Sequence, residues 1–168
     1  MIRTLAAGFG LAALALTAVP AIAGPSENTF LASLAGNYIG KSTVTDQNGK
    51  PQPVTCRLTV AGSTGRATYN GRCSMAGATF SMTGTVAFVG GKYVAAMSGS
   101  NGISGNANGV FRGGRVTFSN SGHDTTAGGN RDVVSTLSLA PGDIRVNFGV
   151  RDNKTGKTMR GTIPFRRS

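Results

Sequence analysis

Apolar and polar residues alternate with period two from Gly36 to the end of the chain. Gly, Asn, Asp or Pro interrupts the alternation about every 8–12 residues, which is typical of antiparallel strands joined by turns. The pattern predicts about ten strands, at residues 37–45, 53–60, 67–74, 78–89, 92–99, 103–112, 115–121, 131–140, 143–151 and 157–166. We expect an all-β fold, an antiparallel up-and-down β-barrel of about 8–10 strands, because closure leaves no exposed edge strand. A two-sheet β-sandwich is the alternative.

The proposed turns predict strand partners, because paired positions in an antiparallel hairpin add up to a constant. A turn at Thr64-Gly65 places Cys56 directly opposite Cys73, on the face that also carries Leu58 and Val60. The same arithmetic places apolar residues opposite apolar residues or glycine around turns at Gly90-Gly91, Gly113-Gly114, Pro141-Gly142 and 153–156. One register therefore satisfies both faces of the sheet.

The inner face of the predicted barrel carries aromatic side chains and many small residues. The aromatic row, which we interpret as core, comprises Phe80, Phe88, Tyr93, Phe111, Phe118, Phe148 and Phe165. Interspersed Gly and Ala either leave a cavity for an apolar ligand or give these rings room. The phase of residues 100–110 is open. Either Ile103, Ala107 and Phe111 point inward, or a bulge near Asn101-Gly102 shifts the pattern.

The N-terminus has the three parts of an export signal. Arg3 supplies the positive charge, residues 5–19 are apolar, and Ala21-Ile22-Ala23 is a small-x-small cleavage pattern. We expect cleavage after Ala23 and a periplasmic or secreted protein. The expected domains are a signal peptide at 1–23, an N-terminal extension with a short helical turn at 24–35, and a single β-barrel domain at 36–168.

Cys56 and Cys73 are the two cysteines of the chain. Their opposed positions and the oxidising compartment that export implies predict one disulfide bond. The bond would lie inside the barrel and close a loop of 16 intervening residues. We interpret it as structural.

The segment Leu34-Ala35-Gly36-Asn37-Tyr38-Ile39-Gly40 follows the short helical turn and opens the first strand. It resembles the Gly-x-Trp start of lipocalins and related calycin barrels, with Tyr38 in place of tryptophan. The resemblance implies that Tyr38 packs at the closed end of the barrel under an arginine from a late strand, for which Arg160 is the candidate. The strand number is nearer ten than eight, and a second lipocalin motif is not evident. The hairpin that carries the cysteines is also similar to small periplasmic metallopeptidase inhibitors, which are shorter and usually carry tryptophan.

Longer loops gather at one predicted end of the barrel, opposite the tight turns. They comprise residues 46–52, 75–77, 100–102, 121–130 and 152–156. Binding residues usually lie on such loops, and calycins open their cavity at this end. The candidate binding residues at this mouth are Asp46, Lys50, His123, Asp124, Asp152 and Lys154.

Catalytic and cofactor sites have little support in the residues. His123 with Asp124 could act as a base with an orienting carboxylate, which makes a hydrolase the low-ranked alternative. One histidine and two paired cysteines cannot form a transition-metal shell, and Asp46 and Asp152 suit Asx turns better than Ca²⁺. No Gly-rich run precedes a helix, which argues against a phosphate loop. We expect no catalytic residue, metal or cofactor.

The chain is strongly basic. It has 17 Lys and Arg against 6 Asp and Glu, and removal of Arg3 would leave a net charge near +10. In the proposed register Arg57 faces Arg72, and Arg112 flanks Arg115 across a turn. Like charges that face each other are mildly destabilising, so these four arginines indicate an anion-binding surface. Lipid or an anionic envelope glycan is the expected partner. Nucleic acid is not expected, because the outer face has no aromatic stacking platform.

These observations favour a non-enzymatic exported β-barrel that binds a small apolar ligand or an anionic cell-envelope component. The alternative is a protein-binding module with a protein partner, such as a periplasmic peptidase inhibitor. A barrel that spans a membrane would present apolar side chains to lipid. Here the outer face is rich in Arg and Thr, so we do not expect the chain to span a membrane.

Overall fold

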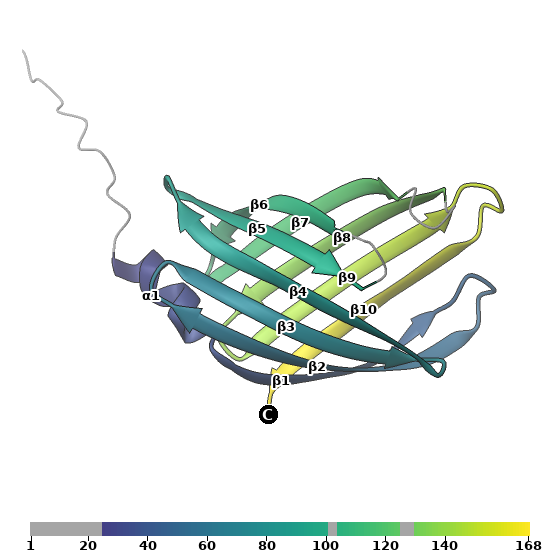
Figure 1. Cartoon of the computed structure of the whole chain (residues 1–168), viewed down its shortest axis with the longest axis horizontal. Helices are drawn as coiled ribbons and strands as arrows, with labels where there is room; N and C mark the ends of the chain where they lie inside the picture. The colour runs from purple at the N-terminus through teal and green to yellow at the C-terminus, as the bar shows by residue number, and fades with distance from the viewer. Residues whose placement is uncertain (1–24, 101–103, 125–129) are drawn as a thin grey trace, which may run out of the picture.

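The chain folds into a closed β-barrel in a computed structural model that describes residues 25–100, 104–124 and 130–168 (Figure 1). Side chains are described from residue 29 onward within these ranges, except those of 123 and 124. The predicted signal peptide, residues 1–23, lies outside the described residues. No helix within the described ranges is long and apolar enough to cross a membrane.

One short helix precedes ten strands in the described chain. The elements are α1 (Pro25–Ser33), β1 (Gly36–Thr45), β2 (Pro51–Ser63), β3 (Arg66–Met75), β4 (Ala78–Val89), β5 (Lys92–Gly99), β6 (Ser104–Arg112), β7 (Arg115–Asp124), β8 (Arg131–Ala140), β9 (Asp143–Asp152) and β10 (Thr158–Arg167). Each strand pairs antiparallel with its chain neighbours, and β1 pairs with β10 to close the ring. The up-and-down barrel is confirmed, and the β-sandwich alternative is wrong.

The predicted register is confirmed for the five hairpins whose turns were proposed. Cys56 faces Cys73, Phe88 faces Tyr93, Leu139 faces Ile144 and Ile144 faces Phe165. The described chain therefore follows one alternation, in which every second side chain points inward. That regularity arises because glycines at positive φ, such as Gly65 and Gly142, make the tight turns that keep the strands in phase.

The sequence left open which side chains of β6 face inward, and the structure determines this for two residues. Ala107 faces Ala95 and packs against the core, and Phe111 lies on the same face of the strand. The bulge alternative and Ile103 lie outside the described residues. Phe111 is a correction to the predicted core row, because it is 44% exposed at the end of β6. Its ring centroid lies 5.4 Å from that of Phe30 and 6.0 Å from that of Tyr93.

Helix α1 covers the end of the barrel where the tight turns lie (Figure 1). Leu31 and Leu34 are fully buried there, and the edge of the Phe30 ring meets Tyr93 at a centroid distance of 5.8 Å. Strand β2 passes directly under the helix, because a Cβ at Gly62 would lie 2.3 Å from the Leu31 carbonyl oxygen. This end, the closed end, is therefore filled by side chains.

Tyr38 is fixed at the closed end by the last residue of β10. It is 1% exposed, and its hydroxyl donates to the Leu34 carbonyl at 2.7 Å. The guanidinium of Arg167 lies over its ring, 5.7 Å from the centroid. The candidate partner Arg160 is wrong, because it faces Thr45 at the other end of β1. The prediction placed the arginine too early in β10.

The Cys56–Cys73 disulfide is present and joins β2 to β3. Both cysteines are essentially inaccessible, with exposures of 0% and 1%. The bond lies inside the barrel, so it joins the two strands from the core side and is structural.

Candidate functional site

On β8 and β9, inward-facing side chains become more exposed from the closed end toward the mouth. Leu139 of β8 and Ile144 of β9 are buried near the closed end. Farther along the same strands and on the same face, Val133 and Val150 are partly exposed. This side of the inner wall is thus packed near the closed end and partly open to solvent near the mouth, whereas Val44 of β1 and Val54 of β2 stay buried toward the mouth.

Four inward-facing apolar side chains near the mouth form what we call the mouth wall: Met97 of β5, Val133 of β8, Val150 of β9 and Met159 of β10. In the described chain, none of the four packs against the buried core. Val133 faces Val150, and Val150 faces Met159, so three of them form a row across β8–β10. Among the described residues, the mouth wall is therefore an inward-pointing apolar surface that stays partly exposed.

Tyr69 of β3 adds a phenol to the inner face between the closed end and the mouth. Its ring crosses Gly84 of β4, where a Cβ would lie 2.4 Å from the Tyr69 hydroxyl oxygen. Burial raises the pKa of Tyr69 to about 12, so the hydroxyl stays protonated at neutral pH. The hydroxyl has no hydrogen-bond partner among the described residues. It is therefore available to donate to a ligand.

Asn120 of β7 and Ser135 of β8 add polar groups beside the mouth wall. They face each other in the register and are partly exposed on the inner face. Asn120 lies over β6, since a Cβ at Gly105 would be 2.8 Å from its Nδ2. The inner wall thus combines apolar side chains with a few hydrogen-bonding groups, as ligand sites usually do.

Aspartate side chains organise two turns at the rim of the mouth. The Asp46 carboxylate accepts the Lys50 backbone N–H at 2.9 Å, which holds the pKa of Asp46 below its ordinary value. The Asp152 carboxylate accepts the backbone N–H of Thr155 at 2.8 Å and of Lys154 at 3.0 Å, and the Thr155 bond lowers its pKa most. Both carboxylates are thus engaged in their own turns.

The rim turns are also bonded to each other. The Lys157 Nζ donates to the Asn48 Oδ1 at 2.7 Å, which joins the β9–β10 turn to the β1–β2 turn. The Asn153 Nδ2 donates to the Asn130 Oδ1 at 2.9 Å, which joins the β9–β10 turn to the start of β8. These bonds fix the rim on the side where the row from Val133 to Met159 lies.

The predicted mouth residues divide into two groups. Asp46, Lys50, Asp152 and Lys154 lie in the two linked rim turns. His123 and Asp124 end β7, where they face Asp132 and Arg131, but their side chains lie outside the described residues. The proposed His123–Asp124 pair therefore stays a prediction. In the described ranges, no three His, Cys, Asp or Glu side chains are grouped to hold a metal ion.

The predicted anion-binding arginines form two separate pairs. Arg57 faces Arg72 on β2 and β3, and Arg112 faces Arg115 on β6 and β7. Arg115 is engaged within the protein, since it donates to the Asp143 carboxylate at 2.6 Å. The pair of Arg57 and Arg72 is therefore better able than the pair of Arg112 and Arg115 to bind an anion from outside the protein.

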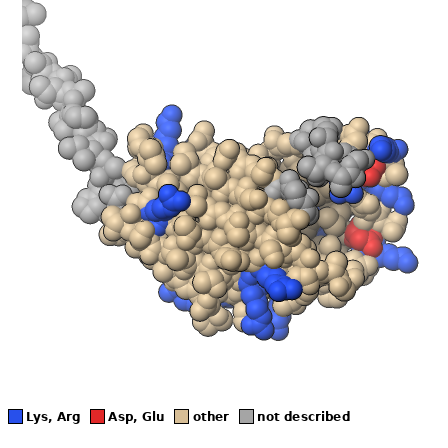
Figure 2. Space-filling view, viewed as in Figure 1, with Lys and Arg blue, Asp and Glu red and all other residues tan. Residues whose placement is uncertain are grey.

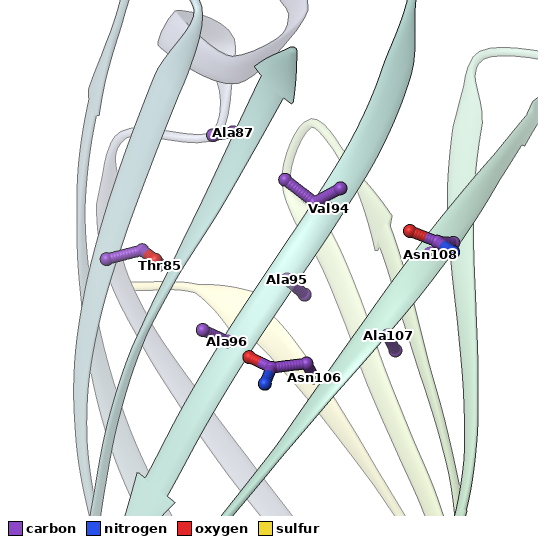
Figure 3. Close-up of a pocket in the computed structure, with 8 residues that line it drawn as sticks. All are labelled: Thr85, Ala87, Val94, Ala95, Ala96, Asn106, Ala107 and Asn108. Carbon is purple, nitrogen blue, oxygen red and sulfur yellow. The ribbon is translucent and has the colours of Figure 1, made fainter. Parts of the chain in front are cut away.

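A shallow hollow of ≈ 290 Å³ lies on the barrel wall over β4, β5 and β6 (Figure 3). Its lining has no charged side chain and comprises Thr85, Ala87, Val94, Ala95, Ala96, Asn106, Ala107 and Asn108. Side chains such as Val94 and Asn108 alternate with the inward Ala95 and Ala107, so the hollow belongs mainly to the outer face. It is separate from the mouth wall.

Comparisons with known proteins identify the fold alone. No family model and no curated protein matches the chain. Among solved structures, the chain is similar to Rv2717c from M. tuberculosis, with a TM-score of 0.62 and 14% identity over 82% of this chain and 94% of that chain. An identity this low supports the shared barrel architecture and carries no activity across.

Sequence reasoning missed the mouth wall, because it placed the binding residues on loops. The alternation already showed that Met97, Val133, Val150 and Met159 face inward. Their distance from the tight turns also placed them near the mouth. Only the packed structure shows that α1 covers the opposite end, and that among the described residues these four side chains stay partly exposed and do not pack against the buried core.

Proposed function

We propose that this barrel binds a small, mainly apolar ligand through its mouth and does not act as an enzyme. The observation that carries the proposal is the mouth wall, which points inward and is partly exposed. Covering such surface contributes about 25 cal/mol per Å² of apolar area removed from water. A ligand inserted between Met97 on β5 and the row from Val133 to Met159 would cover it.

The ligand that fits this wall carries a hydrogen-bond acceptor. The protonated Tyr69 hydroxyl supplies a donor on the inner face, and the Asn120 amide and Ser135 hydroxyl supply further polar groups. An apolar body with one polar group, such as a fatty acid ester or a small isoprenoid, matches this combination.

Two further features support an exported, calycin-like binding protein. Tyr38 lies under an arginine of the last strand at the closed end, as the calycin resemblance implies. The buried Cys56–Cys73 disulfide suits an oxidising compartment, which fits the export signal expected at residues 1–23.

Adjacent valines on β8 give a matched test. Val133 faces inward, whereas Val134 faces outward and is 56% exposed. We expect Val133→Asn to weaken binding of an environment-sensitive naphthylamine probe about tenfold, because the amide places unpaired polar groups against the apolar ligand. Val134→Asn should leave the affinity within about twofold.

Both variants should be compared by fluorescence titration and by mass spectrometry of organic extracts from the purified proteins. Equal affinities in the two variants would show that the probe binds the outer surface, and the proposal would fail. An apolar compound that is retained by the parent and by Val134→Asn but is lost from Val133→Asn would support it.

A further inference from the structure

A row of basic side chains crosses the outer face of β1–β3, which points away from the core. Arg72 of β3 faces Arg57 of β2, and Arg57 faces Ile39 of β1. Ile39 in turn faces Arg166 of β10. The three arginines are exposed. Figure 2 shows Lys and Arg side chains gathered at the lower edge of the barrel, where β1–β3 run in Figure 1.

Two more cations widen this row into what we call the basic face: Lys41, Arg57, Arg72, Arg145 and Arg166. Lys41 lies two residues beyond Ile39 on β1, and Arg145 lies on β9, where it faces Pro164. Both are exposed. The face therefore extends over five neighbouring strands and carries charges in two adjacent rows.

Acidic side chains are scarce on the basic face. Asp143 forms ion pairs with Arg115 and Arg166, and so its charge is shared between them. The remaining described aspartates lie toward the mouth: Asp46, Asp132 and Asp152. Within the described part of the chain, Arg57 and Arg72 have no hydrogen-bond or ion-pair partner. The positive charge of these two side chains is therefore unbalanced.

We infer that the basic face binds a linear acidic polysaccharide, an activity separate from that of the mouth wall. One anionic group between Arg57 and Arg72 would bond both guanidiniums and remove their mutual repulsion. A linear chain can then continue toward Arg166. Hydroxyl side chains lie beside this path: Ser81 faces Arg72, and Thr55 faces Ser74 one step along the strands. They suit the hydroxyl groups of sugars.

The surroundings favour a polysaccharide over a bilayer. A surface that binds lipid firmly usually adds apolar side chains that insert among the acyl chains. The large apolar side chains that are exposed in the described chain are Val89, Val110, Phe111 and Val134. They lie on β4, β6 and β8, away from the basic face.

The surroundings also argue against single-stranded nucleic acid. Binding of unpaired bases relies on outward aromatic rings on which they stack. In the described residues of β1–β3, β9 and β10, every aromatic side chain lies on the inner face. The basic face offers charge and hydroxyl groups without a stacking platform.

The test compares two double variants with equal loss of charge. Arg57→Gln with Arg72→Gln alters the basic face, and Lys92→Gln with Arg160→Gln removes the same charge from the start of β5 and from the mouth end of β10. Polygalacturonate is the acidic probe and dextran the neutral one. We expect the first double variant to weaken polygalacturonate binding at least about tenfold, and the second to change it less than about twofold.

A gain of affinity provides a result that misfolding cannot imitate. Asp143→Asn removes the acidic group beside Arg166 and should strengthen polygalacturonate binding about threefold at low salt. Equal losses in the two double variants would show that only net charge matters and would overturn the inference. Tighter binding to phosphatidylglycerol vesicles or to oligothymidylate than to polygalacturonate would overturn it as well.

Discussion

The guanidinium of Arg167 lies over the ring of Tyr38, 5.7 Å from its centroid, and joins three separate parts of the chain. Its Nη2 donates to the carbonyl oxygens of Ser33 at 2.9 Å and of Ala35 at 2.8 Å. The last strand is thereby tied to the first strand and to the end of α1. One side chain supports both the closure of the barrel and the docking of the helix.

Replacement of this arginine should loosen the closed end. Arg167→Ala removes two bonds to backbone carbonyls and the contact with the Tyr38 ring, so we expect a loss of about 1–2 kcal/mol in the free energy of unfolding. Arg160→Ala is the matched control on the same strand and should cost less than about 0.5 kcal/mol. Urea unfolding measures both, and an equal effect of the two variants would contradict the role given to Arg167.

The disulfide should contribute substantially to stability. The chain-entropy estimate for its loop is about 3 kcal/mol, because the bond restricts the unfolded chain. Cys56→Ala with Cys73→Ala, or reduction of the parent protein, should lower the urea midpoint accordingly. The double variant should then show no further change when reductant is added. Equal stability with and without the bond would contradict this prediction.

Two glycines should respond oppositely to alanine. At Gly84 a Cβ would lie 2.4 Å from both the Ala96 carbonyl oxygen and the Tyr69 hydroxyl. Gly84→Ala should therefore destabilise the barrel by about 1–3 kcal/mol. At Gly122 nothing lies within 4 Å of the added Cβ, so Gly122→Ala should be neutral or stabilising by up to about 1 kcal/mol. Thermal or urea unfolding distinguishes the two.

Tyr69 should make the barrel sensitive to high pH. Burial raises its pKa from 10.0 to about 12. The unfolded chain therefore releases the proton first as the pH rises. Stability should be unaffected below pH 10 and should fall, by about 1–3 kcal/mol in all, as the pH passes from 10 toward 12. Tyr69→Phe should remove this part of the decline in the free energy of unfolding. In a pH titration followed by tyrosinate absorbance, the variant should lack the ionisation step that occurs at the highest pH.

The alternation predicted the strands and their partners because each proposed turn fixes a whole hairpin. Cys56 opposite Cys73 and Leu139 opposite Ile144 follow from turn positions alone. The arginine above Tyr38 could not be obtained in this way, since it depends on the stagger between β1 and β10, which no turn connects. Arg160 and Arg167 both belong to β10, and only the closed ring distinguishes them.

The candidate site depends on packing along the barrel axis, which alternation does not describe. The period-two alternation shows that Val133 faces inward, but it does not show which side chains inside the barrel cover it. Leu31 of α1 and Leu34, which follows the helix, fill one end, whereas the mouth wall at the other end stays partly exposed among the described residues. The rim turns were placed correctly at Asp46 and Asp152, whose side chains proved to serve the turns themselves.

The pairing of β1 with β10 also governs the order in which the barrel can assemble. Every other strand contact joins consecutive segments and can form as a hairpin while later residues are still being synthesised. Closure must wait for the last strand, and until then β1 and β9 each present an unpaired edge. A chain halted before residue 158 is therefore the species most exposed to aggregation, and chaperone protection matters most at that stage.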